Sequence, residues 1–232
     1  MWLAAILGHL LGDYVFQTDK LAGWKSRSVW GVLAHSGIVT LCTWVCSLPF
    51  SPRWWPYALL IGAVHAAIDV ARTKVKTRSP GLVLLLFCLD QALHVLVITL
   101  VVRGSGWIDL SRTETALGAW LVEGSRLRYL TGYVLLSMPS WVLVHFVVSG
   151  TGAVSKSLPG RPGERYVGML ERGLIATFVL MGNLLAVPLV LVPRLAIDGL
   201  GSRVETERVG YLGEILASVS LAVAVGLLLR VV

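Results

Sequence analysis

The stretch GLVLLLFCLDQALHVLVITLVV at positions 81–102 decides the fold class of this chain. It is apolar along its length apart from one polar interruption around Asp90 and His94. A helix of about 20 apolar residues is long enough to cross the hydrocarbon core of a bilayer. Because a backbone in lipid must satisfy its own hydrogen bonds, we expect this stretch to be a transmembrane α-helix.

Similar apolar runs recur along the chain. The composition agrees with many spans, since 56% of the residues are hydrophobic and 14% are charged, whereas a soluble domain carries about 25% charged residues. Windows of span length select about 2–17, 29–48, 55–71, 129–148, 173–193 and 211–229 besides the stretch above. The first run lacks the basic start and the cleavage pattern of a signal peptide, so we expect it to remain as a span. The sequence therefore predicts an all-α, polytopic transmembrane helical bundle of about seven spans.

The predicted bundle is a single membrane domain that covers the whole chain, 1–232. Residues 1–102 form a four-helix section that contains His and Asp, residues 103–128 form an outer loop, and residues 129–232 hold three further spans. Within the loop, Ser111 and Glu114 have the spacing of a capping box. This spacing predicts a short interfacial helix over the residues that follow.

The basic residues predict an orientation. The chain has a net charge of +7, and its bases gather in the first, third and fifth loops: Lys20, Lys25 and Arg27; Arg72, Lys74, Lys76 and Arg78; Lys156, Arg161, Arg165 and Arg172. Short cytoplasmic loops carry an excess of Lys and Arg, so we expect the N-terminus outside and the C-terminus inside. Because the bases are spread over loops and not gathered in a hydrophilic domain, no nucleic-acid partner is expected.

Histidine and aspartate recur inside the first four spans. They lie four residues apart in the pairs His9–Asp13, His65–Asp69 and Asp90–His94, and His35 lies in the second span. Residues four apart share one face of a helix. Most of these side chains fall at a similar depth, towards the cytoplasmic end, although neighbouring spans run in opposite directions. We therefore expect the seven side chains to converge.

Aspartates inside a membrane need compensation, because each costs about 2.5–3.5 kcal/mol at a helix centre. A divalent transition metal would neutralise them, and mixed imidazole and carboxylate ligands suit Zn, Mn or Fe. One or two ions fit the candidate ligands His9, Asp13, His35, His65, Asp69, Asp90 and His94. The alternatives are a metal-free hydrogen-bonded network that ties the helices together, a proton-handling site, and a quinone or haem site.

The same residues carry a resemblance to a known family. The motif H-L-x-G-D-[FY]-x-x-Q covers His9 to Gln17, and it is followed by His35, by the H-x-x-x-D of His65 and Asp69, and by the D-Q-x-x-H of Asp90 to His94. This set resembles a bacterial family of small polytopic membrane proteins of unknown function, and Val167–Arg172 and Glu214 match its longer members. The resemblance implies the bacterial cytoplasmic (inner) membrane. More distantly, the His and Asp pattern is similar to inner-membrane metal-dependent hydrolases.

These observations favour a metal-dependent membrane hydrolase that acts on a lipid or another membrane-accessible substrate. A metal activates water for such a reaction, and Asp13 and Asp90 are the candidate catalytic carboxylates. The expected partners are the lipid bilayer and an anionic lipid or small molecule, attracted by the basic loops. A transporter of a divalent cation or a proton-coupled solute stays an alternative, as does an accessory membrane subunit whose polar cluster is structural. The sequence indicates no oligomeric state.

Overall fold

The structure is a computed structural model that describes residues 1–75, 77, 79–107, 112–150, 162–199 and 205–231. These residues form helices joined by turns and contain no strand, so the predicted all-α fold is confirmed. The chain divides into two compact units, Met1–Thr77 with Leu86–Val134, and Arg78–Leu85 with Leu135–Val232. The predicted grouping into one membrane domain stays a prediction.

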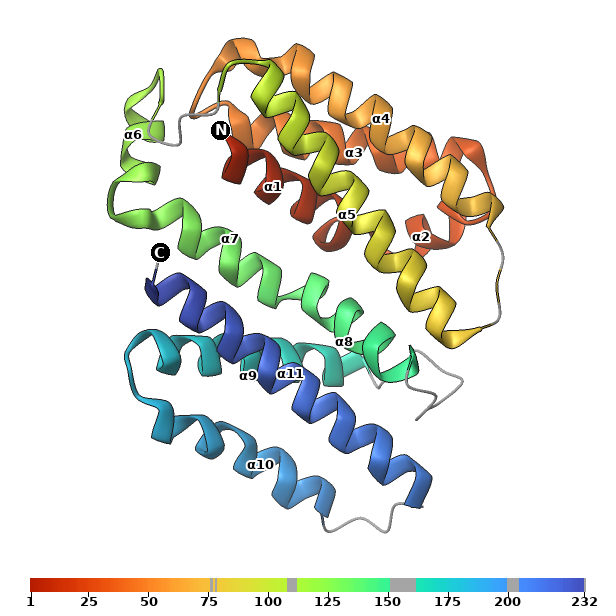
Figure 1. The fold of residues 1–232 in the computed structure, drawn as a ribbon, viewed down its shortest axis with the longest axis vertical. Helices are drawn as coiled ribbons and strands as arrows, with labels where there is room; N and C mark the ends of the chain where they lie inside the picture. Colours follow the sequence, from red (N-terminus) through yellow and green to blue (C-terminus); the bar gives the residue numbers. More distant parts are fainter. Residues whose placement is uncertain (76, 78, 108–111, 151–161, 200–204, 232) are drawn as a thin grey trace. The chain divides into compact units, whose positions relative to one another are not determined.

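The first unit contains the segment 1–102 that was predicted to carry the His and Asp side chains, apart from residues 78–85. Its helices can be followed in Figure 1. Its elements are α1 (Trp2–Leu10), the π-helix η1 (Leu11–Val15), α2 (Asp19–Lys25), α3 (Val29–Ser47), the 3₁₀-helix η2 (Pro52–Trp54), α4 (Trp55–Lys74), most of α5 (Pro80–Gly104), α6 (Ala116–Val122), the 3₁₀-helix η3 (Glu123–Ser125) and most of α7 (Arg126–Leu136). Helix α3 contacts α1, α2 and α4.

The apolar core of the first unit lies at one end of its helices. Buried Ala4 comes from the start of α1, Trp54 and Ala58 from the start of the α4 segment, and Ile98 and Val102 from the end of α5. The His and Asp residues follow these core residues in α1 and α4 and precede them in α5. One end of the unit is therefore packed by hydrophobic contact, and the other end is free for polar chemistry.

Two glycines bring α1 and its π-helical continuation close to α3. A Cβ atom at Gly8 would collide with the backbone of Thr43, and one at Gly12 would lie 2.6 Å from the Cα atom of Val39. Small residues four apart are a common means of close helix packing in membranes. Because His9 and Asp13 directly follow these glycines in the sequence, the close packing holds both residues beside α3.

The second unit has its own core. It is built from α8 (Met138–Gly150), α9 (Pro162–Leu180), the 3₁₀-helix η4 (Leu184–Ala186), α10 (Val187–Gly199) and α11 (Glu205–Val231). Helix α9 contacts α8, α10 and α11. Ile175, Ala176 and Val179 of α9 pack with Ala222 and Val225 of α11.

A buried arginine supports the junction between α7 and α8 in the second unit. These two helices meet at an angle of 43°, beside Pro139, which lacks an N–H group for a helical hydrogen bond. Arg172 is 2% exposed, and its guanidinium donates to the carbonyl oxygens of Leu136 at 2.9 Å and Ser137 at 3.3 Å. A third bond, of 3.2 Å, reaches Ser218 Oγ. Arg172 thus satisfies backbone carbonyls at the bend.

A second arginine of this unit joins two carboxylates. Arg194 Nη1 lies 3.0 Å from Glu171 Oε2, and Arg194 Nη2 lies 2.9 Å from Glu214 Oε1. The three residues come from α10, α9 and α11. The ion pairs tie three helices together, and the pair with Glu171 is largely buried, whereas the Glu214 side chain is 47% exposed.

The described residues contain fewer candidate spans than predicted. Among the described residues, Val29–Ser47, Pro52–Lys74, Pro80–Gly104 and Gly210–Val231 are long and apolar enough to cross a membrane. The bent pair α7 and α8 adds a fifth if it counts as one span. The prediction of about seven spans therefore reduces to four or five candidates.

Two predicted spans account for the difference. The run 2–17 forms only the short apolar helix Trp2–Val15. The run 173–193 is not one helix, because α9 ends at Leu180 and Gly182 takes a φ of +75° in the turn before η4 and α10. A hydropathy window averages across this turn and does not detect it. Five spans would keep the C-terminus on the side expected from seven, whereas four would reverse it, so the orientation stays a prediction.

A short helix, α6, follows α5 as expected but has a different cap, and its place at the membrane interface stays a prediction. Helix α6 begins at Ala116, and its N-cap is Thr115, whose Oγ1 accepts a 3.0 Å hydrogen bond from the Gly118 amide. Glu114 instead accepts a 2.7 Å bond from Ser51 Oγ. Of the predicted features, Ser111 and the bases Lys76, Arg78, Lys156 and Arg161 lie outside the described residues.

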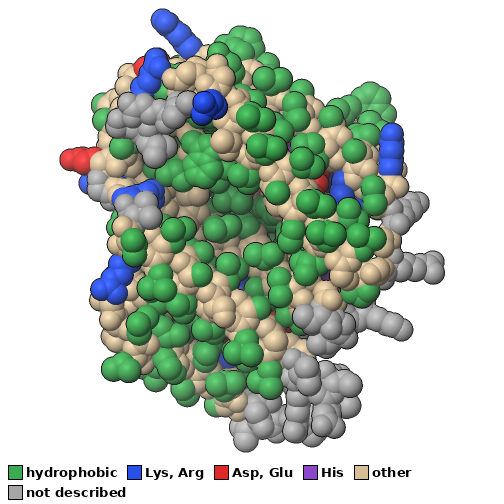
Figure 2. Space-filling model, in the orientation of Figure 1, with side chains coloured by type: hydrophobic (Ala, Val, Ile, Leu, Met, Phe, Trp, Pro, Cys, Tyr) green, Lys and Arg blue, Asp and Glu red, His purple; other side chains and the backbone are tan. Residues whose placement is uncertain are grey.

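Hydrophobic side chains are exposed over both units. Figure 2 shows them across the visible face, where charged side chains are sparse. Leu60 and Leu100 of the first unit are 49% and 57% exposed, and Leu216 of the second is 67% exposed. Contiguous exposed apolar surface is unusual for a soluble protein. It is the expected surface of helices that face lipid.

Candidate metal centre

All seven residues predicted as metal ligands lie in the first unit. They come from α1 (His9), η1 (Asp13), α3 (His35), α4 (His65 and Asp69) and α5 (Asp90 and His94). Six of them are buried, with exposures from 0% for His35 to 6% for Asp13, and the Asp90 side chain is 15% exposed. The convergence expected from the spacing is thus present in the fold, while their roles as ligands or catalysts stay predictions.

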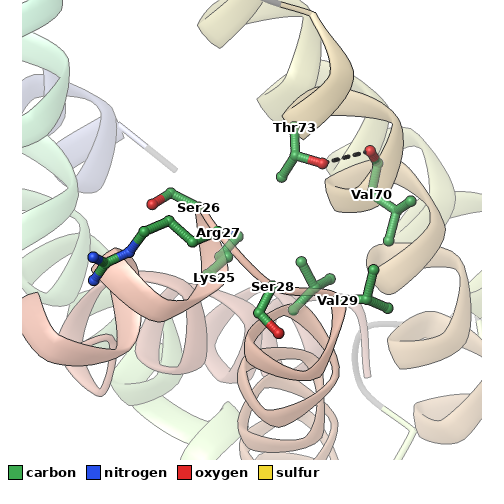
Figure 3. Close-up of a pocket in the computed structure, with 8 residues that line it drawn as sticks. Lys25, Ser26, Arg27, Ser28, Val29, Val70 and Thr73 are labelled. Carbon is green, nitrogen blue, oxygen red and sulfur yellow. Dashed lines mark hydrogen bonds between the residues drawn. The ribbon is translucent and has the colours of Figure 1, made fainter.

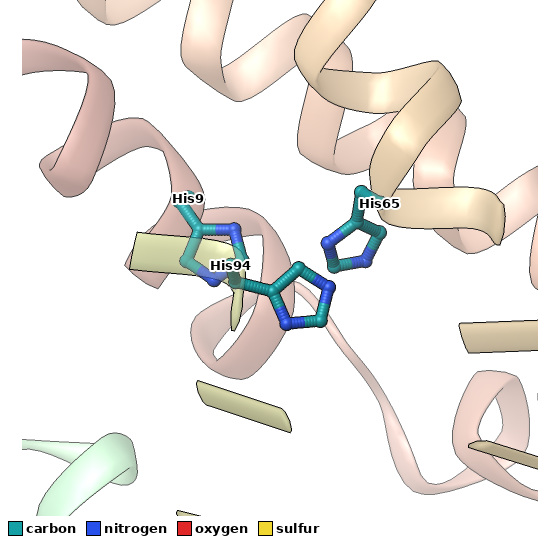
Figure 4. A group of neighbouring side chains, drawn as sticks. All are labelled: His9, His65 and His94. Carbon is teal, nitrogen blue, oxygen red and sulfur yellow. The ribbon is translucent and has the colours of Figure 1, made fainter. Parts of the chain in front are cut away.

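The first group of side chains consists of three imidazoles. One ring nitrogen from each of His9, His65 and His94 lies within 4.8 Å of the other two. Figure 4 shows the three rings facing one another, and their centroids are 4.3 to 5.3 Å apart. Ligands of one tetrahedral ion with metal–nitrogen bonds of about 2.0–2.1 Å are roughly 3.3 Å apart. Small rotations of the side chains would therefore bring all three nitrogens onto one ion.

A backbone hydrogen bond determines which nitrogen His94 offers. Its Nδ1 lies 2.9 Å from the carbonyl oxygen of Asp90. A carbonyl only accepts, so Nδ1 carries the hydrogen, and in the neutral ring Nε2 keeps its lone pair. This Nε2 is buried and has no hydrogen-bond partner among the described residues. Metal-binding histidines commonly donate their other N–H to a carbonyl or carboxylate in this way.

The second group combines carboxylates with imidazoles. One atom each of Asp13, His35 and His65 lie within 4.8 Å of one another. His35 Nε2 donates to Asp13 Oδ1 at 2.9 Å, and it lies 3.2 Å from His65 Nε2. Asp69 Oδ2 is a further 3.2 Å from His65 Nε2. His65 is therefore common to both groups, with Nε2 in the second and an unpartnered Nδ1 that is free to serve the first.

Several buried polar atoms of the cluster have no hydrogen-bond partner within the described part of the chain. They are both ring nitrogens of His9, Nδ1 of His35, Nδ1 of His65, Nε2 of His94 and Oδ1 of Asp90. An unsatisfied buried group costs about 1–3 kcal/mol, and buried polar groups are rarely left so. A purely structural His–Asp network would pair these atoms with one another. The cluster instead offers buried nitrogen and oxygen atoms that could hold a metal ion.

Lys25 is part of the cluster, which the sequence did not indicate. This last residue of α2 places its Nζ 2.7 Å from Asp69 Oδ2 and 3.9 Å from Asp13 Oδ1, and its side chain is only 19% exposed. The sequence analysis assigned Lys25 to a basic loop. The only signal was its position shortly before the second span, which does not distinguish a lysine that reaches back into a bundle from one that faces water.

Asp90, a candidate catalytic residue, lies at the edge of the cluster. Its Oδ2 accepts a 3.0 Å hydrogen bond from Gln91 Nε2 and is 3.7 Å from His94 Nδ1. Oδ1 has no partner among the described residues. Asp13, the other candidate, already accepts a bond from His35. The two carboxylates therefore differ in their hydrogen bonding, because Asp90 keeps an oxygen without a partner among the described residues.

Comparison with known proteins identifies a family but no activity. The family described as "Protein of unknown function (DUF3307)" matches residues 1–122. This range contains the whole His/Asp cluster and agrees with the resemblance seen in the motifs, whereas Val167–Arg172 and Glu214 lie beyond it. No curated protein and no solved structure matches the chain, so the distant similarity to hydrolases has no support from these comparisons.

Proposed function

Because this chain belongs to DUF3307, a family of proteins of unknown function, we propose its function from its own site. It is an integral membrane protein that holds a divalent transition metal at the His/Asp cluster and hydrolyses a lipid or another membrane-accessible substrate. The observation that carries this proposal is the group of three buried imidazoles, His9, His65 and His94, whose donor atoms include nitrogens without a hydrogen-bond partner in the described chain.

The donor set supports Zn, Mn or Fe as the metal, with one or two ions per chain. Three imidazoles with an open fourth position are a known catalytic zinc arrangement. The adjacent carboxylates of Asp13 and Asp69 add the harder oxygen ligands that Mn and Fe also accept. A metal held here supplies Lewis acidity for hydrolysis.

The chain's own residues supply the remaining functions that hydrolysis needs. Asp90 Oδ1, which is buried and unpartnered within the described residues, is the proposed acceptor of a proton from water. Asp13 orients His35 through their 2.9 Å hydrogen bond. The bases Arg27 and Arg72 lie at the same end of the helices as the cluster and favour an anionic substrate through their potential.

The proposed location is the bacterial inner membrane, with the basic ends of α2 and α4 on the cytoplasmic side. Single cysteines at Arg27 and Lys74, in a background without Cys42, Cys46 and Cys88, report this orientation. We expect impermeant thiol reagents to label them only in opened cells. Labelling in intact cells would place the site on the outer side of the membrane.

Elemental analysis of the purified protein tests the metal site. We expect one or two transition-metal ions per folded chain, and their loss in His65→Ala and in His94→Ala. His145→Ala is the matched control, because His145 lies in the second unit and is not in the cluster. A folded wild type that contains no metal and cannot be loaded with Zn, Mn or Fe would contradict the proposal.

Lipid turnover tests the reaction. Purified protein mixed with phospholipid vesicles should release a hydrolysis product, and a chelator should stop the release until metal is restored. Asp90→Asn should retain the metal and lose about 10²–10⁴-fold in rate, the usual contribution of a general base. Full activity in Asp90→Asn would remove that residue from the mechanism.

Cation transport is the second candidate, and one observation favours it. The first apolar segment ends as a half-length helix, Trp2–Val15, whose last turn is π-helical and carries Asp13. Transporters often bind cations where helices are interrupted. Metal uptake into proteoliposomes that is lost in Asp13→Asn, without any lipid turnover, would favour transport over hydrolysis.

A further inference from the structure

Lys25 is the counter-ion of two buried carboxylates at the second group of the cluster. Its ammonium lies 2.7 Å from Asp69 Oδ2 and 3.9 Å from Asp13 Oδ1. Those two side chains are 5% and 8% exposed. The positive charge therefore occupies the place where a cation would meet these carboxylates.

Without the ammonium, the second group is a complete cation site. Asp13 Oδ1 is 2.9 Å from His35 Nε2, and Asp69 Oδ2 is 3.2 Å from His65 Nε2 and 3.7 Å from His35 Nε2. Two carboxylates and two imidazoles form a ligand set that suits Mn, Fe or Zn. The first group, by contrast, consists of imidazoles alone and has no carboxylate with which Lys25 could form an ion pair.

The charges of the cluster favour one resident ion while Lys25 is in place. With ionised Asp13, Asp69 and Asp90, a protonated Lys25 and neutral imidazoles, one divalent cation makes the whole cluster neutral. A second divalent cation beside the ammonium would leave two positive charges in excess in a buried site, which is costly. The second ion can therefore bind well only when the ammonium moves away.

A cavity beside Lys25 provides room for that movement. It has a volume of about 210 Å³, and its lining includes Lys25, Arg27, the hydroxyls of Ser26 and Ser28, and Thr73 from α4 (Figure 3). Lys25 therefore both contacts the carboxylates and lines an open space.

We propose that Asp13, His35, His65 and Asp69 form a second, exchangeable divalent-cation site, and that Lys25 is its built-in competitor. Binding of the second cation moves the ammonium from Asp69 into the cavity, and loss of the cation lets it return. This inference rests on the proposed metal centre and deepens it, because it assigns different affinities to the two groups. The first ion is held by imidazoles and stays, while the second follows the available metal concentration.

Titration of the purified full-length protein with Mn²⁺ tests this assignment, with bound ions counted by electron paramagnetic resonance. Wild type should bind one ion tightly and a second more weakly. Lys25→Met and Lys25→Gln should bind the second ion about tenfold or more tightly, because a like charge next to the site has been removed. The first affinity should not change, and adding Asp69→Asn should abolish the gain.

Lys20→Met is the matched control, because Lys20 lies in the same helix and its side chain is exposed. It removes the same charge and should leave both affinities unchanged. Equal affinities for the second ion in wild type, Lys25→Met and Lys25→Gln would overturn the inference and leave the proposed metal centre intact. Two equally tight ions in wild type would also overturn it. Failure of wild type and every variant to bind Mn²⁺, Zn²⁺ or Fe²⁺ would remove the metal centre itself.

Discussion

The two units of this chain differ in whether their polar side chains have hydrogen-bond and ion-pair partners. In the second unit, Arg194 pairs with Glu171 and Glu214, and Arg172 donates three hydrogen bonds. In the first unit, both ring nitrogens of His9 and Nε2 of His94 have no hydrogen-bond partner among the described residues. A complete network needs nothing more, whereas an incomplete one needs a ligand to offset its cost.

This difference assigns a role to each cluster. Polar groups in a membrane protein are retained either because they bind helices together or because they serve a function. The arginines of the second unit bridge α9, α10 and α11 and support a bent helix pair. We therefore interpret the second network as structural and the first as functional, and variants can test both interpretations.

The largest expected effect is on stability, from Arg194→Met. This change removes the cation between two carboxylates, of which Glu171 is 9% exposed in its side chain. Breaking a buried ion pair from one side costs about 3–5 kcal/mol, while metal content per folded chain should not change. Denaturant unfolding in detergent measures the loss, and Arg103→Met, at an exposed base in α5, is the control. Unaltered stability in Arg194→Met would end the structural interpretation of the network.

The next effect is on the link between metal and stability. Wild type held at a free metal concentration 100 times its dissociation constant should lose about 2.7 kcal/mol of stability when a chelator is added. His9→Leu should show no such loss, because it lacks one of the imidazoles that would bind the metal. Metal-free His9→Leu should be at least as stable as metal-free wild type, since an apolar side chain replaces two unsatisfied nitrogens. A large destabilisation of metal-free His9→Leu would mean that His9 is structural after all.

A smaller effect is expected from the close packing that positions the cluster. A Cβ atom at Gly12 would lie 2.6 Å from Val39 Cα, whereas one at Gly37 meets nothing within 4 Å. Gly12→Ala should therefore cost about 1–3 kcal/mol by overpacking and weaken metal binding, since Asp13 is its neighbour. Gly37→Ala should be stabilising by up to about 1 kcal/mol. Thermal unfolding and metal titration of the pair distinguish the two sites, and equal behaviour would contradict the observed packing.

The smallest expected loss of stability comes from a helix cap outside both clusters, and it is a reference for the larger losses. Thr115 caps α6 through a 3.0 Å bond to the Gly118 amide, and Thr115→Ala should cost about 1 kcal/mol. Thr115→Ser keeps the hydroxyl and should keep the stability. Neither change should alter metal content. A loss as large as that of Arg194→Met would show that stability in this protein does not follow burial.

Parts of this description could be predicted from local sequence. Long apolar runs predict helices because lipid leaves the backbone no other partners, and four of these runs are confirmed as candidate spans. The pairs His9–Asp13 and His65–Asp69 share a helix face because of the helical repeat. The prediction failed at Gly182, where the positive φ interrupts an apolar run, because hydropathy does not depend on backbone conformation.

The sequence by itself therefore determined the helical class and the candidate ligands, since both follow from properties of residues close together in the chain. Only the tertiary structure decided which buried polar atoms lack a hydrogen-bond partner and which charged side chains form ion pairs. Lys25 reaches Asp69, and Arg194 reaches Glu171, across 44 and 23 positions of sequence. Such contacts depend on how helices pack, because a long side chain can face water or reach into a bundle from the same position in the sequence.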